Sequence, residues 1–291
     1  MTALDLAIVQ RLVDATLAED RADLDITTGS LSKWIDWRQG NAHLTARADG
    51  VVCGLDFALA AFAALDPDVR FLPEVSDGDQ VSAGQQIAVV GGQLDPLLRA
   101  ERTALNWLQR LSGTATLTAQ AVAAAGTRTK ILDTRKTTPG LRPAERYAVR
   151  CGGGLNHRDS LASGVLIKDN HIAAVRQAGG TLADAVSAAV ANVGPATGVE
   201  VEVTNLEEAR EALDAGATAL LLDNFATDDL PPVVEVARVY NAKTEASGGI
   251  TIKQIPDIAR SGVDYISLGA LTHSAPSLDI ALDIALELAP D

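Results

Sequence analysis

Two stretches in the first half of the chain have apolar residues at helical spacing. Leu4, Ile8 and Leu12 recur at intervals of four, which predicts an amphipathic helix over residues 4–18. From residue 94 to 125 apolar positions recur every three or four residues, which predicts a second and longer helix. Both helices are expected to bury one face and to leave the other in water.

Strand patterns lie between these helices. Residues 41–54 and 71–92 carry apolar and β-branched runs with Asp-Gly and Ala-Gly turn signals, which predict short strands and tight turns. The second segment also resembles a biotinyl or lipoyl carrier hammerhead. It contains no lysine that could hold a prosthetic group, however, so a structural role is preferred. Residues 1–112 are therefore predicted to form an α/β sandwich domain.

The second half of the chain alternates strand-like and helix-like runs. Helical patterns that end near glycine, such as 204–217 and 251–262, separate the strands. The predicted strands cover 130–133, 164–168, 198–203, 218–223, 243–247 and 264–269. Repeated βα units imply a parallel sheet, so residues 113–274 are predicted to form a TIM-like (β/α) barrel, which is expected to be incomplete. The final apolar repeat predicts a helix over 275–291 that packs on the first domain.

The run GVEVEV at 198–203 shows which side chains face the barrel interior or its mouth. A period of two puts Glu200 and Glu202 on one face and the three valines on the other. The valines are expected to face the helices or the core, and the acids the lumen or solvent. Glu202 lies nearer the end of the strand.

Most of the predicted strands end in residues that can do chemistry. The residues at or just after these ends are Arg135, Lys136, Lys168, Glu202, Asp223, Ser247 and Gly269. Because barrel enzymes place their active sites at the carboxyl ends of the strands, these residues are expected to meet at one mouth. The last two strands end at the small residues 247–249 and at Leu268 and Gly269, and these segments suit a phosphate site built from backbone N–H groups.

Composition narrows the class of protein. The 291 residues are 47% hydrophobic, which is enough for a sizeable core, and the formal net charge is −14. Two cysteines make a disulfide framework improbable and fit a reducing cytoplasm. The acidic N-terminal stretch does not look like a signal peptide, and no apolar run is long enough for a membrane helix. A cytoplasmic protein that binds neither nucleic acid nor membrane is expected.

Basic residues gather in one window of this acidic chain. Residues 128–176 hold ten Lys or Arg against four acids, which favours a small polyanionic ligand. Arginines such as Arg135 and Arg158 can make bidentate contacts with carboxylates or phosphates, and Lys136 and Lys168 can act as point charges. The glycines at 152–154 can let backbone N–H groups approach an anion.

This window carries a resemblance to a known family. The segment DTRKTTPGLRPAERYAVRCGGGLNHR, followed by LIKDNH, closely resembles quinolinate phosphoribosyltransferases, which are also called carboxylating nicotinate-nucleotide pyrophosphorylases. Further matching segments occur in order along the chain: EDRADLDITT, ERTALN, VEVEV, LLLDN, ASGGI and DYISLGALTHS. One position of the signature, Leu155 in GGGLNHR, is apolar. The resemblance covers essentially the whole sequence.

The resemblance implies an activity and a set of site residues. The reaction converts quinolinate and phosphoribosyl pyrophosphate to nicotinate mononucleotide, pyrophosphate and CO2 with Mg²⁺, in NAD biosynthesis. Lys136, Lys168, Glu202 and Asp223 would be catalytic, and the two acids would also hold the metal, directly or through water. The implied substrate-binding residues are Arg102, Thr134, Arg135, Lys136, His157, Arg158, Lys168, Glu202, Asp223, Ser247, Gly248, Gly249, Leu268, Gly269 and His273. The resemblance further implies a homodimer in which Arg102 reaches the neighbouring subunit's site.

Other functions were weighed against this one. A class I aldolase-like barrel would use Lys168 as a Schiff-base amine. A metal-dependent hydrolase would need a ligand cluster around His157, His171 or His273, and no such spacing is present. A doubly wound phosphoribosyltransferase would need a phosphate loop after Asp223, which the sequence lacks. A binding or carrier protein, a molybdenum-associated relative and a non-decarboxylating nicotinate phosphoribosyltransferase complete the alternatives.

Overall fold

The computed structural model describes residues 4–35, 38–194 and 197–286. The chain divides into two compact units, each made of more than one stretch. The first unit comprises 1–119, 137–153 and 271–291, and the second comprises 120–136 and 154–270. Within the described residues, no helix is both long enough and apolar enough to span a bilayer.

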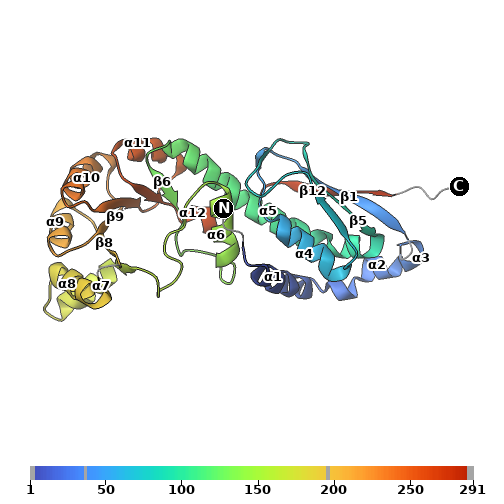
Figure 1. Ribbon diagram of the computed structural model, residues 1–291, viewed down its shortest axis with the longest axis horizontal. Coiled ribbons are helices and arrows are strands. Elements are labelled where there is room, and N and C mark those ends of the chain that lie inside the picture. The colour runs from blue at the N-terminus through green and yellow to red at the C-terminus, as the bar shows by residue number, and fades with distance from the viewer. Residues whose placement is uncertain (1–3, 36–37, 195–196, 287–291) are drawn as a thin grey trace. The chain divides into compact units, whose positions relative to one another are not determined.

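The first unit is built on an antiparallel sheet with helices over one face (Figure 1). The sheet has the order β12-β1-β5-β3, from β1 (Gln39–Ala46), β3 (Arg70–Pro73), β5 (Gln86–Gln93) and β12 (Ile280–Leu286). Its helices are α1 (Leu6–Glu19), α2 (Ile26–Ser30), α3 (Ser32–Ile35), α4 (Leu55–Leu65), α5 (Leu94–Ala125), α6 (Arg142–Cys151) and α12 (Ala270–His273), with a 3-10 turn at Ala22–Leu24. The last residues of α5, 120–125, and the first of α12 belong to the second unit. Two short strands, β2 (Gly50–Val51) and β4 (Gln80–Val81), form a separate pair. The two helices and the strands predicted for this region are confirmed.

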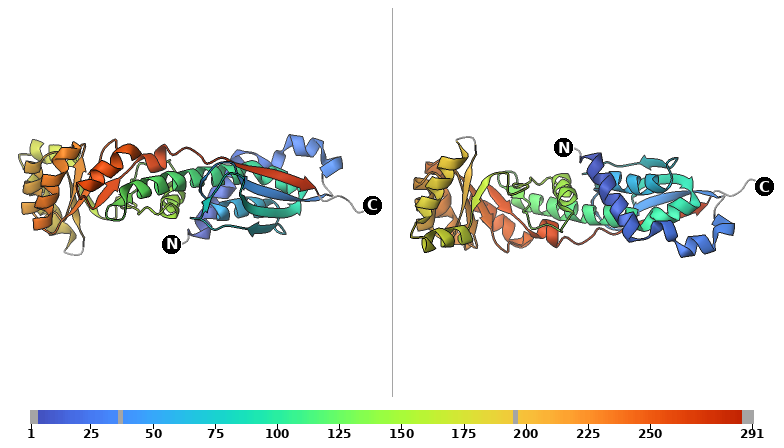
Figure 2. Two further views of the ribbon diagram at one scale, coloured as in Figure 1. Left: turned by 90° about the horizontal axis from the view of Figure 1, so that it is seen from above. Right: turned by 90° about the horizontal axis from the view of Figure 1, so that it is seen from below.

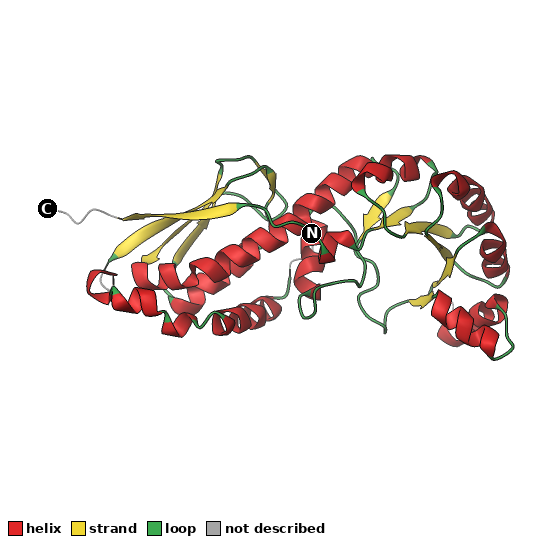
Figure 3. Ribbon diagram, turned by 180° about the vertical axis from the view of Figure 1, so that it is seen from behind, coloured by secondary structure: helices red, strands yellow, loops and turns green. Residues whose placement is uncertain are grey.

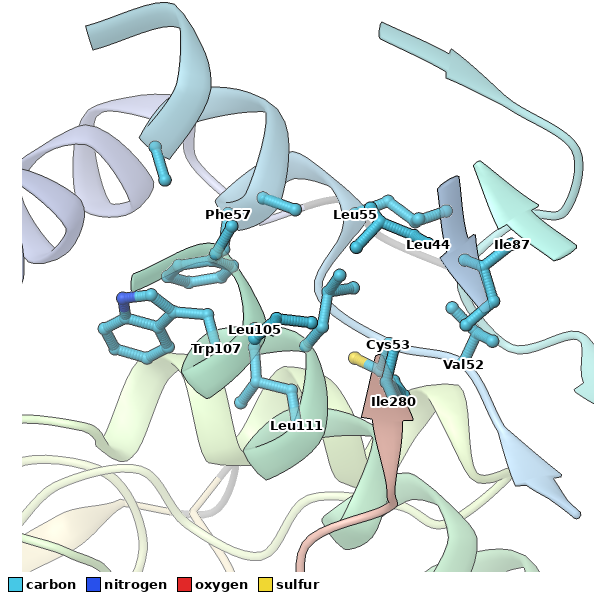
Figure 4. Packing of buried hydrophobic residues seen from close by; sticks show 14 of the residues in the cluster. Leu44, Val52, Cys53, Leu55, Phe57, Ile87, Leu105, Trp107, Leu111 and Ile280 are labelled. Atoms are coloured by element: carbon cyan, nitrogen blue, oxygen red, sulfur yellow. The ribbon is translucent and has the colours of Figure 1, made fainter. Parts of the chain in front are cut away.

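A continuous apolar core fills the space between this sheet and its helices (Figure 4). Leu44 of β1 and Ile87 of β5 are fully buried on the sheet side. On the helix side, Phe57 of α4 stacks on Trp107 of α5 with ring centroids 4.5 Å apart. Each such side chain contributes about 1.5–3 kcal/mol by leaving water, so the hydrophobic effect is the main force that holds the sheet to the helices.

The prediction of a C-terminal helix is wrong. Residues 280–286 form β12, which pairs antiparallel with β1 in the register Ala42↔Ile284 (Figure 2, where this strand is red and β1 is blue). Ile280, Leu282 and Ile284 pack against the core of the first unit, so the expectation that this segment packs on the N-terminal domain is confirmed in another form. The last five residues of the predicted helix, 287–291, lie outside the described residues.

The second unit is an all-parallel sheet of six strands, with helices along its outer side (Figure 3). The sheet order is β6-β11-β10-β9-β8-β7, from β6 (Lys130–Leu132), β7 (Val165–Ile167), β8 (Val199–Val203), β9 (Ala219–Asp223), β10 (Lys243–Ser247) and β11 (Tyr265–Ser267). The helices are α7 (Asp169–Gln177), α8 (Leu182–Val193), α9 (Leu206–Asp214), α10 (Leu230–Val239) and α11 (Ile255–Arg260), with 3-10 turns at Thr227–Asp229 and Ile252–Gln254. Among the described residues β6 and β7 are edge strands that do not pair with each other, so the prediction of an incomplete barrel is confirmed.

The alternation predicted for β8 is also confirmed. Val199, Val201 and Val203 are buried, whereas Glu200 and Glu202 are half-buried and face the opposite side. On the far side of β6, Leu155 makes an isolated parallel bridge with Leu132. The segment that follows Leu155 is therefore anchored at the edge of the sheet, where it can contribute side chains to the barrel interior.

Candidate functional site

A pocket of about 550 Å³ lies in the second unit and collects the residues at the strand ends. It is lined by Thr134, Arg135, Lys136, His157, Arg158, Leu166, Lys168, Glu202, Leu221, Asp223, Asn224, Glu245, Ser247, Gly248, Gly249 and Ser267. Eleven of the fifteen predicted substrate-binding residues are among them, including all four predicted catalytic ones. The parallel strands produce this grouping because their carboxyl ends open at the same edge of the sheet.

One part of the pocket is cationic. Arg135 and Lys136 follow β6, Arg158 belongs to the segment after Leu155, and Lys168 follows β7. Burial and the nearby Arg135 charge lower the pKa of Arg158 from its usual value, and Glu200 partly offsets them. Two arginines that repel each other in one cavity favour a ligand with more than one negative charge.

Two carboxylates lie on neighbouring strands of the same pocket. Glu202 belongs to β8 and Asp223 ends β9, its hydrogen-bonded neighbour. Burial and the negative charge of Asp223 raise the pKa of Glu202, although Lys168 and Lys136 act in the opposite direction. Such a pair of acids is stabilised by a cation between or beside them, and carboxylate oxygens are ligands that Mg²⁺ prefers.

The Ser-Gly-Gly segment at the end of β10 forms another part of the wall. Gly248 has φ +102°, and a Cβ atom there would lie 2.2 Å from Oδ1 of Asn224. Asn224 itself has φ +55°, and its amide hydrogen is donated to the carbonyl oxygen of Ser247. Only glycine fits at 248, because the backbone conformation and the contact with Asn224 both exclude a side chain.

His157 sits among acids in the interior of the unit. Its Nε2 lies 3.3 Å from Oε2 of Glu200 and 3.3 Å from Oε2 of Glu245. Burial lowers the pKa of His157, but the hydrogen bonds and charges of the two glutamates outweigh it and raise the pKa to about 10. The Arg158 amide opposes a second ring proton, because it donates its hydrogen to Nδ1 at 2.7 Å. In either charge state Nε2 carries a proton.

Four predicted site residues are not in the lining of this pocket. Arg102, on α5, and His273, at the end of α12, are exposed and belong to the first unit. Leu268 and Gly269 directly follow β11, and the Leu268 side chain is buried. The glycines at 152–154, which were expected to approach an anion, are not in the lining either.

Gly152 has a packing role instead. A Cβ atom at this position would lie 2.3 Å from the carbonyl oxygen of Ala115, so the glycine lets α6 approach α5 within the first unit. His171 was also considered as a metal ligand in the sequence analysis. Its Nδ1 accepts the amide hydrogen of Lys168 at 2.9 Å and caps the start of α7.

Several lining residues were missed by the sequence analysis. Glu245 is the most important of them, because it is only 4% exposed and contacts His157. A signal was available, since a period of two in KTEAS puts Glu245 on the same face as Ser247. Asn224 is another, and its side chain donates a hydrogen bond to Asp223 at 2.7 Å. Ser267 is buried, and its Oγ has no hydrogen-bond partner among the described residues.

Another cavity, of about 460 Å³, lies in the first unit beside α1 and α5. Its lining includes Trp107, Asn106 and Arg110. The cation of this cavity is already engaged, because Arg110 pairs with Glu145 at 2.8 Å and donates to two backbone carbonyl oxygens. The pocket of the second unit, with its four cations and two neighbouring acids, is therefore the better candidate for catalysis.

Comparison with known proteins gives a consistent result over nearly the whole chain. A family model described as the quinolinate phosphoribosyl transferase N-terminal domain matches residues 25–112, and the model of the C-terminal domain matches residues 114–283. The probable carboxylating nicotinate-nucleotide pyrophosphorylase of Bacillus subtilis is 41% identical over 279 residues, which cover 96% of this chain and 94% of that protein.

Solved structures agree with the sequence relatives. The nicotinate-nucleotide pyrophosphorylase from Francisella tularensis has a TM-score of 0.89 and 41% identity, and the match covers 97% of this chain and 98% of that one. NadC from Streptococcus pyogenes has a TM-score of 0.92 and 37% identity, with coverage of 99% and 100%. The fold and the sequence therefore point to the same family.

Proposed function

Since this chain belongs to the quinolinate phosphoribosyltransferase family, we propose that its strand-end pocket converts quinolinate and phosphoribosyl pyrophosphate to nicotinate mononucleotide, pyrophosphate and CO2. The enzyme is a decarboxylating phosphoribosyltransferase of NAD biosynthesis. The observation that carries the assignment to this pocket is its composition: cations that suit a dicarboxylate, two adjacent acids and a glycine-rich wall share one cavity.

The cationic part of the pocket suits quinolinate. Its two carboxylates need at least two fixed cations, and Arg135 and Arg158 can each offer a planar fork. Lys136 and Lys168 supply compact charges nearby. Burial and the Arg135 charge both lower the pKa of Arg158, and a dianion that binds between the cations offsets both, so the same groups favour the bound state.

The acids and the glycine-rich wall of the pocket suit phosphoribosyl pyrophosphate and Mg²⁺. Glu202 and Asp223 offer oxygen ligands on adjacent strands, and their mutual repulsion favours a cation there. The metal would stabilise the negative charge of the departing pyrophosphate. Backbone N–H groups at 247–249 suit the 5′-phosphate, and the family resemblance assigns Leu268 and Gly269 to the same phosphate.

The side chains of this chain catalyse the reaction mainly by position and charge. The pyridine nitrogen of quinolinate is the nucleophile, so no general base is needed. Arg135 and Arg158 hold the ring in line, while Glu202 and Asp223 can stabilise positive charge on the ribose. Once the ring is ribosylated, its positive charge stabilises the electron pair that the departing CO2 leaves on the ring carbon, and a proton from water then adds to that carbon.

The function is tested by incubating the purified enzyme with Mg²⁺, phosphoribosyl pyrophosphate and either quinolinate or nicotinate. Nucleotide formation is followed by chromatography and CO2 release in parallel. Equal amounts of nucleotide and CO2 from quinolinate only are expected. No product from quinolinate would overturn the assignment, and turnover of nicotinate would indicate the non-decarboxylating relatives instead.

The raised pKa of Glu202 predicts how metal binding depends on pH. A proton competes with Mg²⁺ for this carboxylate, and the competition begins at a higher pH than for an ordinary glutamate. The affinity for Mg²⁺ with phosphoribosyl pyrophosphate should therefore fall as the pH is lowered from 7 to 5, as measured by titration calorimetry. Glu202→Gln is the control, because its remaining pH dependence comes from the ligand and from the other groups of the site. If the affinity fell equally steeply with pH in the wild type and in Glu202→Gln, the assignment of Glu202 as a metal ligand would be contradicted.

The family resemblance further supports a cytoplasmic homodimer in which Arg102 completes the neighbouring subunit's site. Arg102→Ala and Lys136→Ala should each be nearly inactive alone. When they are mixed and allowed to exchange subunits, hybrid dimers gain one site that has both residues intact, so about a quarter of the wild-type activity should return. No recovery, despite subunit exchange shown by mass spectrometry, would mean that Arg102 acts within its own subunit.

A further inference from the structure

One cluster of the second unit contains two acids to which no role in the reaction has been assigned. It consists of His157, Glu200 of β8 and Glu245 of β10, whose ligand-type atoms all lie within 4.8 Å of one another. The side chains of the three are 13%, 16% and 4% exposed, respectively. Oε1 of Glu245 has no hydrogen-bond partner among the described residues. Burying two carboxylates costs free energy unless they are paired or hydrogen-bonded, so the contacts that they make are expected to matter.

The cluster has the composition of a metal site, but its hydrogen bonds argue against one. The amide hydrogen of Arg158 is donated to Nδ1 of His157 at 2.7 Å, so the proton of the neutral ring is on Nε2. Nε2 is also the atom that faces both glutamates. A protonated nitrogen has no lone pair for a metal, and metal-bound histidines usually donate from their other nitrogen rather than accept there. The glutamates are therefore acceptors for the ring.

The ring in turn is one of two anchors on the segment that carries Arg158. The other anchor is Asp133, which is fully buried at the end of β6. Asp133 accepts the amide hydrogen of His157 at 2.8 Å and the side-chain amide of Asn156 at 2.6 Å. Asp133, after β6, therefore holds the main chain at His157, and Glu200 of β8 and Glu245 of β10 hold its imidazole. The Arg158 amide donates to the same imidazole.

We propose that Glu245, with Glu200 as a second acceptor, is a positioning residue for quinolinate: it holds the His157 ring, and through the ring it orients Arg158 toward the pocket. The inference rests on the proposed function for the identity of the ligand. Glu245 lines the pocket, but it is only 4% exposed, and its carboxylate oxygen Oε2 lies 3.3 Å from Nε2 of the ring. Its effect on the substrate therefore passes through His157.

Glu245→Leu tests this role, because leucine keeps a similar volume and removes both acceptor oxygens. The KM for quinolinate should rise about tenfold or more, since a charge-assisted hydrogen bond is lost, while the KM for phosphoribosyl pyrophosphate stays within about twofold. Glu245→Gln keeps one carbonyl oxygen for Nε2 and should recover most of the loss. A merely structural role would instead reduce the yield of folded enzyme or raise both KM values together.

Glu211→Leu is the matched control. Glu211, on α9 of the same unit, accepts one backbone hydrogen bond from Ala183 at 2.9 Å and is not in the pocket lining. This variant also removes one glutamate and one hydrogen bond, and both KM values should stay within about twofold of wild type. An equal change in the two variants would overturn the positioning role.

Hydrogen exchange keeps this test independent of the reaction. In Glu245→Leu the amide of Arg158 should exchange at least about tenfold faster, measured by mass spectrometry on a peptide that spans 156–159, because the ring, held at Nε2 by Glu200 alone, keeps the amide hydrogen bond closed for less of the time. Glu245→Gln and Glu211→Leu should exchange like wild type. Faster exchange without quinolinate turnover in the wild type would reject the proposed function and keep the positioning. Unchanged exchange in Glu245→Leu would reject the positioning, whatever the kinetics.

Discussion

Replacing Lys136 or Arg158 with alanine should lower kcat/KM for quinolinate by at least about 100-fold, which corresponds to about 2.7 kcal/mol of transition-state stabilisation. Both side chains line the pocket of the second unit. Their loss removes a cation from the group that binds a dianion in a partly buried site, where charges interact more strongly than in water. Steady-state kinetics with each substrate varied in turn measures the effect.

Two further variants show whether charge or shape matters. Arg158→Lys keeps the charge and loses the planar fork, so its kcat/KM should lie between those of wild type and Arg158→Ala. Arg176→Ala is the control from the same basic window. Arg176 is exposed, pairs with Glu208 at 3.2 Å and is not in the pocket lining, so its kinetics should be close to wild type. Near-normal kinetics in Lys136→Ala or Arg158→Ala would refute the assignment.

The strand-end residues could be predicted because one rule links sequence to position in a parallel barrel. Apolar runs such as 218–223 end in a polar residue, and all carboxyl ends lie at one edge of the sheet. The rule therefore brings Lys168, Glu202 and Asp223 together without knowledge of the packing. It says nothing about a residue such as Arg102, which belongs to the other unit.

The C-terminal segment shows why a short apolar repeat was misread. The run IALDIAL fits a helical period, but it also alternates Ile280, Leu282 and Ile284 with smaller or polar residues. Whether this run forms a helix or a strand depends on its pairing partner. Here β1 offers a free edge and an apolar face to cover, so the run forms a strand. Local periodicity does not contain that information.

The anchoring of Arg158 could not be predicted from spacing either. Asp133, His157 and Glu245 are far apart in the sequence, and the path of the loop after Leu155 brings them together. The family resemblance implies that His157 binds substrate. The structure adds that both of its ring nitrogens already have protein partners, so it also holds the loop in place.

Replacing Glu145 with alanine should reduce the free energy of unfolding of the first unit by about 3–5 kcal/mol, since breaking a buried ion pair leaves an uncompensated charge. The Glu145 side chain is fully buried on α6. It accepts hydrogen bonds from Arg110 at 2.8 Å, from the Thr138 amide at 3.0 Å and from the Thr138 hydroxyl at 2.7 Å. Its removal therefore leaves three donors without this acceptor in a place that water reaches poorly.

The measurement can be confined to the first unit. All three tryptophans of the chain, at 34, 37 and 107, lie within residues 1–119, so tryptophan fluorescence during urea unfolding reports on this unit. Asp283→Ala is the matched control, because it also removes one acid of an ion pair, with Arg47, in the same unit. That pair is exposed, so its loss should cost no more than about 1 kcal/mol. If Glu145→Ala were as mild as this control, burial would not be what makes the pair important. The segment around Thr138 would then be held mainly by the apolar packing of α6 on α5.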